Sequence, residues 1–368
     1  MAKQFTINIP QSKLDELRRR LEATTLPAEL GDDWSYGADP AYMKKLLSYW
    51  EKSFDWRAVE KKLNAFNHFT AEVSDTRLHF IHEKSENPDA TPLLLIHGWP
   101  DSFYRFYKVI PELTKNFHVV VPSLPGFGFS DKVAVNSTQA ADLLASLMHD
   151  ELGYETFAVS SGDIGTPIVR DLAVQHKELV KLAHLTDMGY PTGSEDFASM
   201  TPAEQAFAGQ CQQWWYTEGA YTMEQSTKPQ TLAYALTDSP LGLAAWIVEK
   251  FQSWSDGGID KAFTKEEILT NISIYYFTGT IATAIGMYAQ NTRAMYATGM
   301  PKPPAKIEVP TAVASFPAET VRVVEEWAKR NANVIRFTEM PKGGHFAALE
   351  QPELFAKDIY EAVETLQA

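Results

Sequence analysis

The chain of 368 residues contains little cysteine, little positive charge and no long apolar run. Cys211 is the only cysteine, so an internal disulfide is impossible, and the absence of a neighbouring histidine favours a buried, inert thiol. Lysine and arginine number 33 against 47 aspartates and glutamates. The resulting net charge of −14 argues against nucleic acid or an anionic membrane as a partner.

Targeting signals are also missing from the sequence. Residues 1–10 contain no apolar core of a signal peptide, 366–368 match no retention or peroxisomal signal, and no stretch approaches the length of a membrane span. Together with the single cysteine, these absences predict a cytoplasmic protein without a membrane anchor. The remaining composition, with 45% hydrophobic and 22% charged residues, is that of a globular protein with a large core.

Residues 1–68 are predicted to form an N-terminal helical extension. Leucines recur at helical spacing over 11–23, and two further helical tracts follow at 42–54 and 59–63. We expect this extension either to wrap the core or to mediate a homodimer.

Residues 69–192 and 303–368 are predicted to form the core. Short, wholly apolar runs recur there, as expected of strands that are buried on both faces. These strands are expected at 93–96, 118–121, 157–160, 182–186, 311–314 and 334–338. Helical stretches such as 137–150 alternate with them, and this alternation predicts an α/β fold with a doubly wound, mostly parallel sheet.

The alternation fails between residues 193 and 302, where the pattern is helical only. Capping boxes are expected to begin helices at Thr201 and Thr264, and the segment is rich in aromatic residues. We interpret 193–302 as a helical lid that is inserted between two strands of the core.

Asp163 follows the expected strand 157–160 at a tight turn, and a helix is expected from Ile164 onward. Gly162 and Gly165 are small enough for the sharp bend of a nucleophile elbow. A carboxylate at this position favours displacement at saturated carbon, as in epoxides and alkyl halides. An aspartate between a strand and a helix is also commonly an N-cap. The choice between these roles therefore depends on the other residues of the site.

Ser160 is a second candidate nucleophile, because residues 158–162 loosely imitate G-x-S-x-G. The first glycine of that motif is missing, and the elbow would fall inside the strand. Both points disfavour Ser160.

His345 is the expected general base, since it follows the last predicted strand behind two glycines. The chain order of nucleophile, acid and histidine is the one used by hydrolases with a nucleophile elbow. Glu319 lies at the end of the preceding strand and is expected to orient the imidazole. Glu325 and Glu326 compete for this role, but they belong to an expected amphipathic helix at 321–327 and look solvated.

The loop 97–100 follows a buried strand and is expected to form an oxyanion hole. The donors would be the backbone N–H groups of Trp99 and Ile164. His97 precedes the nucleophile in the chain, so we expect it to fix the loop rather than to act as a base.

Longer motifs are distributed over nearly the whole chain. They are Asp33-Trp-Ser-Tyr-Gly37, Phe54-Asp-Trp-Arg57, His97-Gly-Trp-Pro100, Pro125-Gly-Phe-Gly-Phe-Ser130, Ser161-Gly-Asp-Ile-Gly165, Thr227-Lys-Pro-Gln230, Asp238-Ser-Pro-Leu-Gly-Leu-Ala-Ala-Trp246, Phe316-Pro-Ala-Glu319 and Gly343-Gly-His-Phe-Ala-Ala348. With these motifs the chain resembles the α/β-hydrolase-fold epoxide hydrolases of the microsomal type.

The resemblance implies that Asp163 is the nucleophile, His345 the base and Glu319 its partner. Family members commonly have glycine at position 161 and tryptophan at position 164, where this chain has Ser161 and Ile164. Serine is still small and Ile164 contributes only its amide, so we expect the mechanism to be retained and the pocket shape to differ. We expect no membrane anchor of the kind that animal members have.

The resemblance also implies two lid tyrosines, Tyr221 and Tyr288, that donate protons to the epoxide oxygen. A phenol with a pKa near 10 stays protonated at neutral pH and can donate as the alkoxide forms. The residues alone leave Tyr216, Tyr275 and Tyr276 open as substitutes, since aromatic side chains in a lid mostly serve packing.

The implied activity is hydrolysis of an epoxide to a vicinal diol through a covalent aspartyl ester. The expected partners are a small apolar epoxide and water, without a metal or an organic cofactor. A haloalkane dehalogenase is the nearest alternative, but such enzymes typically have tryptophan after the nucleophile, where this chain has Ile164. A non-catalytic ligand-binding member of the fold is the second alternative, and it would bind ligand without turnover.

Overall fold

A nine-stranded sheet forms the centre of the computed structural model, which describes residues 1–297, 299 and 301–367. The strands are β1 (Lys3–Phe5), β2 (His68–Val73), β3 (Thr76–Glu83), β4 (Thr91–Ile96), β5 (Phe117–Pro122), β6 (Phe157–Ser161), β7 (Val180–Leu185), β8 (Ile307–Ser315) and β9 (Ala332–Glu339). Their spatial order is β1-β2-β3-β5-β4-β6-β7-β8-β9. The pairs β1–β2, β2–β3 and β3–β5 are antiparallel. The other neighbouring strands pair parallel, which confirms the mostly parallel sheet.

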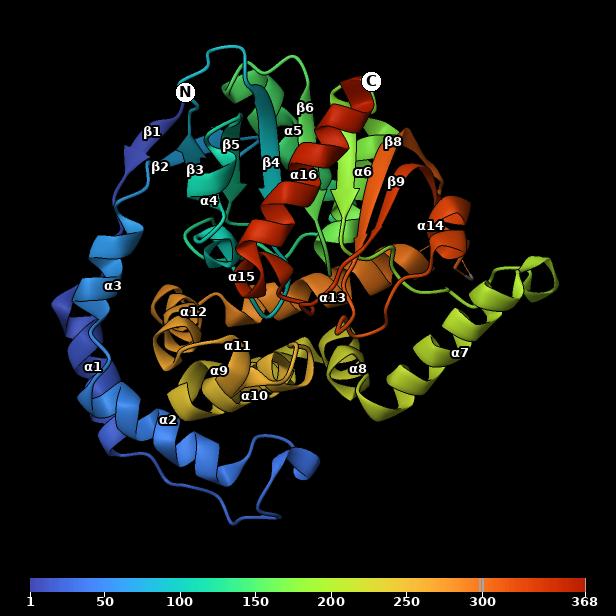
Figure 1. Ribbon diagram of the computed structural model, residues 1–368. Coiled ribbons are helices and arrows are strands. Elements are labelled where there is room, and N and C mark those ends of the chain that lie inside the picture. The colour runs from blue at the N-terminus through green and yellow to red at the C-terminus, as the bar shows by residue number, and fades with distance from the viewer. Residues whose placement is uncertain (298, 300, 368) are drawn as a thin grey trace.

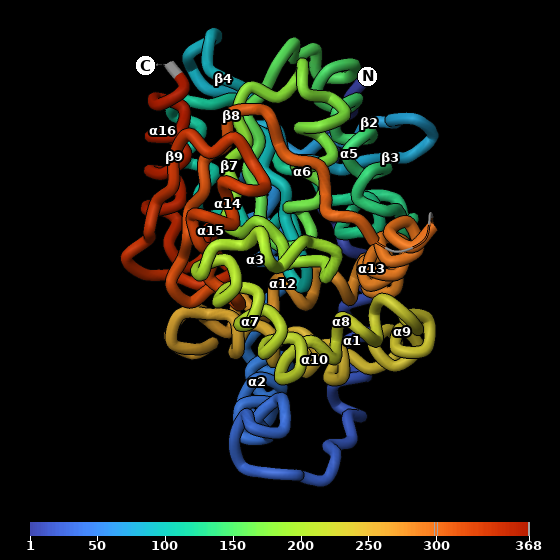
Figure 2. The backbone as a smooth tube through the Cα atoms, turned by 90° about the vertical axis from the view of Figure 1, so that its right-hand side faces the viewer, coloured from blue at the N-terminus to red at the C-terminus, as the bar shows by residue number. Residues whose placement is uncertain are grey.

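Helices cover both faces of this sheet. The core helices are η2 (Phe103–Phe106), α4 (Ile110–Leu113), α5 (Ser137–Ser146), η3 (Leu147–Glu151), α6 (Gly165–Gln175), α14 (Glu325–Asn331), α15 (Ala347–Glu350) and α16 (Pro352–Gln367). Helices α5 and α6 pack together on one face, and α16 crosses the opposite face (Figure 1, Figure 2). Strands β5 and β6 are buried along their whole length, as strands between two helical layers must be.

The helix expected at 321–327 begins only at Glu325. Val321 and Val323 are buried on alternate positions, as in extended chain, and the Ser315 hydroxyl donates to the Val323 carbonyl at 2.9 Å. These contacts hold the segment before α14 out of a helix.

The segment between β7 and β8 is helical and forms the lid. Its elements are η4 (Phe197–Ser199), α7 (Pro202–Thr217), α8 (Ala220–Thr227), α9 (Pro229–Asp238), α10 (Pro240–Ser253), α11 (Ile259–Ala262), α12 (Lys265–Thr278) and α13 (Ile281–Tyr296). The capping boxes expected at Thr201 and Thr264 are both formed. Most lid helices lie below the carboxyl ends of the strands in Figure 1. The boundaries of the lid at residues 193 and 302 stay predictions.

The N-terminal extension contains α1 (Gln11–Glu22), η1 (Trp34–Tyr36), α2 (Pro40–Lys52) and α3 (Trp56–Leu63). It starts at the sheet edge with β1, which the sequence pattern did not reveal, and continues to the far side of the lid (Figure 2). The Lys13 ammonium donates to the Phe277 carbonyl at 2.7 Å, and Arg20 pairs with Asp238 at 3.0 Å. The extension therefore holds the lid from outside.

Within the described part of the chain, no single helix is long and apolar enough to cross a membrane. Helices α12 and α13 reach that length and hydropathy only as a pair, and they are bent by 88° at their junction.

Candidate active site

Asp163 lies in the turn between β6 and α6. Its φ of +58° is in the left-handed region that few residues other than glycine adopt. Helix α6 begins at Gly165 with Ile164 as its N-cap residue and without a side-chain cap. The carboxylate of Asp163 lines a cavity instead. The geometry is thus that of a nucleophile elbow, and the N-cap alternative is wrong.

Two glycines allow the close packing around this elbow. A Cβ atom on Gly98 would lie 2.5 Å from Asp163 Oδ1, and one on Gly165 would lie 1.9 Å from Ser161 Oγ. The Ser161 hydroxyl donates to the Ile96 carbonyl of β4 at 2.9 Å. Serine at position 161 is therefore accommodated by a hydrogen bond to the neighbouring strand.

Backbone amides bind the Asp163 carboxylate. The N–H of Trp99 donates to Oδ1 at 2.7 Å, and the N–H of Ile164 also hydrogen-bonds the carboxylate. The loop that carries Trp99 is fixed by His97, whose Nδ1–H donates to the Gly98 carbonyl at 2.9 Å. The N–H of Leu124 donates to His97 Nε2 at 3.1 Å, and burial lowers the pKa of His97 to about 4. His97 is a neutral structural residue, as expected.

Glu319 and His345, the predicted acid and base, meet where β8 and β9 end. His345 Nδ1–H donates to Glu319 Oε1 at 2.6 Å, and His345 Nε2 lies 3.5 Å from Asp163 Oδ2. A β-bridge between Ala318 and Gly344 ties the two loops together. Glu325 and Glu326, by contrast, are exposed on α14.

Further contacts fix the histidine loop. The Glu350 carboxylate accepts the N–H groups of Gly344 at 3.1 Å and Phe346 at 3.0 Å. The buried guanidinium of Arg105 donates to the His345 carbonyl and to Asp101, both at 2.5 Å. The sequence pattern gave no reason to single out Arg105, because its role depends on two loops that lie far apart in the chain.

The lid tyrosines Tyr221 on α8 and Tyr288 on α13 line the same cavity as Asp163 and His345, with a volume of about 220 Å³. The Tyr221 ring stacks on Trp99 with centroids 5.3 Å apart and planes at 11°. Tyr288 meets the same indole edge-on at 5.9 Å and 84°.

The substitutes left open by the sequence lie elsewhere. Tyr216 is 84% exposed, and Tyr276 is half-buried outside the cavity. The Tyr275 hydroxyl donates to the Asp101 carbonyl at 2.6 Å, so its proton is committed to holding the 97–102 loop.

Ser160 has a histidine and an aspartate nearby but no access to substrate. Its Oγ lies 2.8 Å from His184 Nδ1, and His184 Nε2 lies 3.2 Å from Asp358. The three residues are at most 2% exposed, and none of them lines the cavity that contains Asp163. A buried serine of this kind cannot act on a substrate.

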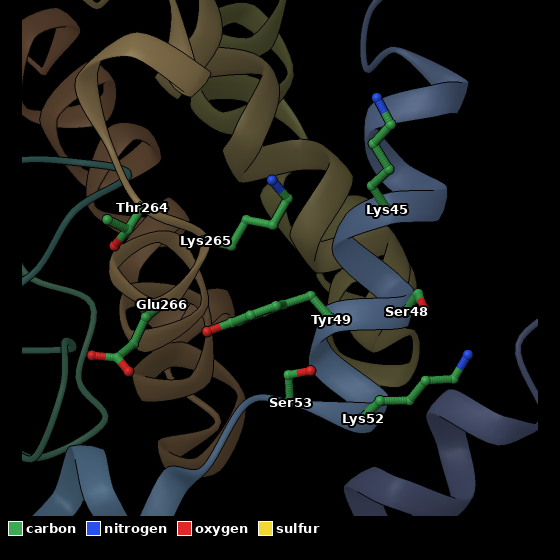
Figure 3. A pocket seen from close by; sticks show the side chains of 8 residues that line it. All are labelled: Lys45, Ser48, Tyr49, Lys52, Ser53, Thr264, Lys265 and Glu266. Carbon is green, nitrogen blue, oxygen red and sulfur yellow. The ribbon is translucent and has the colours of Figure 1, made fainter.

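A larger hollow of about 660 Å³ lies between α2 and the start of α12 (Figure 3). Its lining consists of Lys45, Ser48, Tyr49, Lys52, Ser53, Thr264, Lys265 and Glu266. Among the described residues, neither serine of this hollow has a side-chain hydrogen bond to a histidine, a lysine or a carboxylate, so the smaller cavity at Asp163 is the better candidate.

Similarity to known proteins identifies the family of this chain. Residues 2–106 match the family model described as epoxide hydrolase N terminus, and 91–231 match the alpha/beta hydrolase fold. A putative epoxide hydrolase of Stigmatella aurantiaca is 38% identical over 99% of this chain and 85% of its own length. Epoxide hydrolase 1 of Sus scrofa is 35% identical over 99% and 88%. The chain belongs to the epoxide hydrolase family.

Solved structures confirm the α/β-hydrolase fold of this epoxide hydrolase. The structure of Aspergillus niger epoxide hydrolase is 31% identical, has a TM-score of 0.87 and covers 100% of this chain and 97% of its own. Juvenile hormone epoxide hydrolase from Bombyx mori is 28% identical with a TM-score of 0.85, over 100% and 94%.

The electrostatic environment shifts the pKa values of Asp163 and His345 in this epoxide hydrolase. Burial raises the pKa of Asp163 to about 6, although His345 and the backbone amides lower it. Burial lowers the pKa of His345, but Glu319 and Asp163 outweigh this effect and raise it to about 9. At neutral pH the site therefore holds an Asp163 carboxylate that faces an imidazolium.

The phenols respond to the same carboxylate. Burial, and then the charge of Asp163, raise the pKa of Tyr221 and of Tyr288 above the usual value for tyrosine. Both hydroxyls are consequently protonated at neutral pH and available as donors.

Asp187 also lines the cavity at Asp163, and the sequence pattern did not identify it. Its Oδ2 accepts the N–H of Asp163 at 2.6 Å and the hydroxyl of Thr166 at 2.9 Å, while Oδ1 accepts the N–H of Gly189 at 2.9 Å. The sequence did contain a signal for Asp187, because an acidic residue follows β7, which pairs with the strand β6 that precedes Asp163. Asp187 supports the strained turn at Asp163.

Proposed function

We propose that Asp163 opens the ring of a small apolar epoxide and that water then cleaves the resulting ester to a vicinal diol. In the first step, Asp163 Oδ2 forms a bond to an epoxide carbon as the carbon–oxygen bond of the ring breaks. Tyr221 and Tyr288 supply the proton to the departing oxygen. The observation that carries the proposal is the single cavity that Asp163, His345 and both tyrosines line.

In the second step, His345 removes a proton from water, and the oxygen of that water attacks the ester carbonyl carbon. Oδ1 is then the carbonyl oxygen; the Trp99 amide already binds it, and the Ile164 amide, which also bonds the carboxylate, is the second donor to the oxyanion. Ester formation also removes the charge of Asp163, one of the two carboxylates that raise the pKa of His345. The loss of that charge lets the imidazolium release its proton to solvent, and the neutral imidazole that results is the base that accepts the proton of water.

The lining of the cavity supports an apolar substrate. Tyr190, Trp214, Trp215 and Trp254 surround the catalytic groups, and aromatic walls of this kind bind apolar surface. A volume of about 220 Å³ fits a small molecule.

The alternatives explain less of the site. A dehalogenase needs no proton donor for a departing halide, and Ile164 has no side-chain donor to hold one. A non-catalytic binding protein would not need His345 held by Glu319 at 2.6 Å, next to an aspartate whose backbone is in the left-handed region. A cytoplasmic location and a homodimer stay predictions.

A single turnover in ¹⁸O-labelled water, with enzyme in excess over an aryl epoxide such as styrene oxide, tests the covalent route. The diol should contain no label, because its new oxygen comes from Asp163 and the water oxygen remains on the enzyme. Label in the first diol would mean direct attack by water and would refute the ester. Absence of any diol from a panel of epoxides would refute the substrate class.

A further inference from the structure

Lys250 on α10 places a buried ammonium beside the active site. The residue is 6% exposed, and lysine is rarely buried to this degree without a specific partner. Its Nζ forms an ion pair with the neighbouring Glu249 and lies 4.6 Å from the centroid of the Tyr221 ring and 5.8 Å from that of Trp254. No step of the mechanism above uses this charge.

An ammonium over the face of a phenol has a specific electrostatic effect. It is attracted to the electron-rich ring, and the attraction increases when the hydroxyl loses its proton, because the phenolate ring is more negative. The carboxylates of Asp163 and Glu249 have the opposite effect, since both disfavour the phenolate. Lys250 is therefore the charge that opposes them.

The two lid tyrosines differ in this respect. Among the described residues, a cation lies over the Tyr221 ring and none lies over the ring of Tyr288. Tyr288 instead contacts the edges of Trp99 and Tyr221, with centroids at 5.9 Å and 6.3 Å.

We propose that Lys250 is a positioning residue for ring opening, whose ammonium makes Tyr221 the principal proton donor and leaves Tyr288 as a hydrogen-bond donor. This inference rests on the proposed role of Tyr221. During attack, negative charge leaves the Asp163 carboxylate as the ester forms. The alkoxide takes the proton of Tyr221, so the charge arrives on the phenol that Lys250 covers. The phenolate recovers a proton when ester hydrolysis releases one.

The test is a single-turnover measurement of ester formation and ester hydrolysis in Lys250→Met, which keeps the length of the side chain and removes its charge. Ester formation should slow about tenfold, a typical effect for a desolvated cation–ring contact. Ester hydrolysis should not change, and Lys250→Arg should retain most of the rate. Lys250→Gln serves as a second uncharged variant should the methionine variant fail to fold.

Two controls isolate the effect of the charge. Lys250→Met combined with Glu249→Gln should be slowed to the same degree, because then Glu249 is not left as a carboxylate without its ion-pair partner. Lys265→Met removes a lysine that lies 5.8 Å from the Tyr42 ring, next to the hollow of Figure 3, and should leave both steps unchanged.

A double-mutant cycle decides whether Lys250 acts through the phenol. In a Tyr221→Phe background, Lys250→Met should not slow ester formation further, because phenylalanine has no hydroxyl proton whose transfer the ammonium could favour. Equal losses in both backgrounds, or no loss in the native one, would overturn the proposal and leave the proposed function intact. Tyr221→Phe without any effect on ester formation would instead show that the role of Tyr221 itself is wrong, and the inference would fail with it.

Discussion

The carboxyl edge of the sheet and the lid both face the cavity, but they position their functional groups by different means. At the sheet edge, hydrogen bonds fix each group: Trp99 N–H to Asp163 at 2.7 Å, and His345 to Glu319 at 2.6 Å. In the lid, contacts between aromatic rings position the tyrosine side chains. The hydroxyl of Tyr288 has no hydrogen-bond partner among the described residues.

This difference suggests that the two chemical steps depend on different parts of the molecule. In the proposed mechanism, ester hydrolysis uses groups that the core holds by itself, whereas ring opening also needs the lid in its place. The lid is tied to the core loop by the Tyr275 hydroxyl, which donates to Asp101 O at 2.6 Å, and the Asn271 amide, which donates to Pro100 O at 2.7 Å. Substitutions in the two regions should therefore affect the two steps separately.

The largest effect is expected from Asp163→Ala, which removes the core group that both steps require. Diol formation should be abolished in a protein that still folds, as measured by product analysis and thermal unfolding. Ser160→Ala is the matched control at the buried serine and should retain the activity. Substantial turnover by the folded Asp163→Ala protein would contradict the nucleophile assignment.

His345→Gln should stop the cycle between the steps, because attack on the epoxide can proceed while water is no longer activated. Turnover should fall by at least the factor of about 10² to 10⁴ that a general base contributes. The intact mass should rise by one substrate mass, and Asp163→Ala/His345→Gln should show no such rise. Normal turnover with an unmodified mass would mean that another base operates.

On the lid side, Tyr221→Phe and Tyr288→Phe should each slow ester formation, and the double variant should lose far more than either. Without both hydroxyls the alkoxide charge has no hydrogen-bond donor in a site that excludes water. The rate of ester formation is therefore expected to fall by a factor of about 10² to 10⁴. Ester hydrolysis should be much less affected, as separate pre-steady-state rates would show. Tyr216→Phe, at an exposed tyrosine, is the control. An unchanged rate of ester formation in the double variant would weaken the epoxide assignment.

Asp187→Ala tests the support of the nucleophile turn in the core. The N–H of Asp163 would lose its acceptor, which should cost about 1 to 3 kcal/mol in the free energy of unfolding. Both steps should slow, because the carboxylate that they share is less well held. Asp187→Asn keeps an acceptor and should retain more stability and rate. Equal behaviour of the two variants in denaturant titrations and rate measurements would argue against this role.

The smallest effect is the pH dependence of ester formation near neutrality. The pKa of Asp163 is raised to about 6, and only its anion attacks, so the rate should be high above this value and fall as the pH drops through it. At pH 6 the rate should be about half of its plateau, and about a tenth at pH 5. The lid phenols stay protonated throughout and should add no dependence. A rate that is constant from pH 8 to pH 5 in the folded protein would contradict this assignment.

The positions of Asp163, Glu319 and His345 could be predicted from the sequence because each follows an apolar strand run. Carboxyl ends of parallel strands share one edge of a sheet, so groups at these ends come close together regardless of the chain between them. The helical nature of the lid was predictable in the same way, from periodicity and capping boxes.

Other features depended on the tertiary structure. Without the family resemblance, Tyr221 and Tyr288 could not be told from Tyr216 or Tyr275, since the packing of helices decides which aromatic ring reaches the cavity. The contacts of Asp187 with the nucleophile turn and of Lys250 with Tyr221 likewise join residues through folding, and no local pattern encodes them. The sequence by itself determined the strand ends and the chemistry carried there. Only the tertiary structure decided which lid side chains face that chemistry, because burial and distance are properties of the packed molecule.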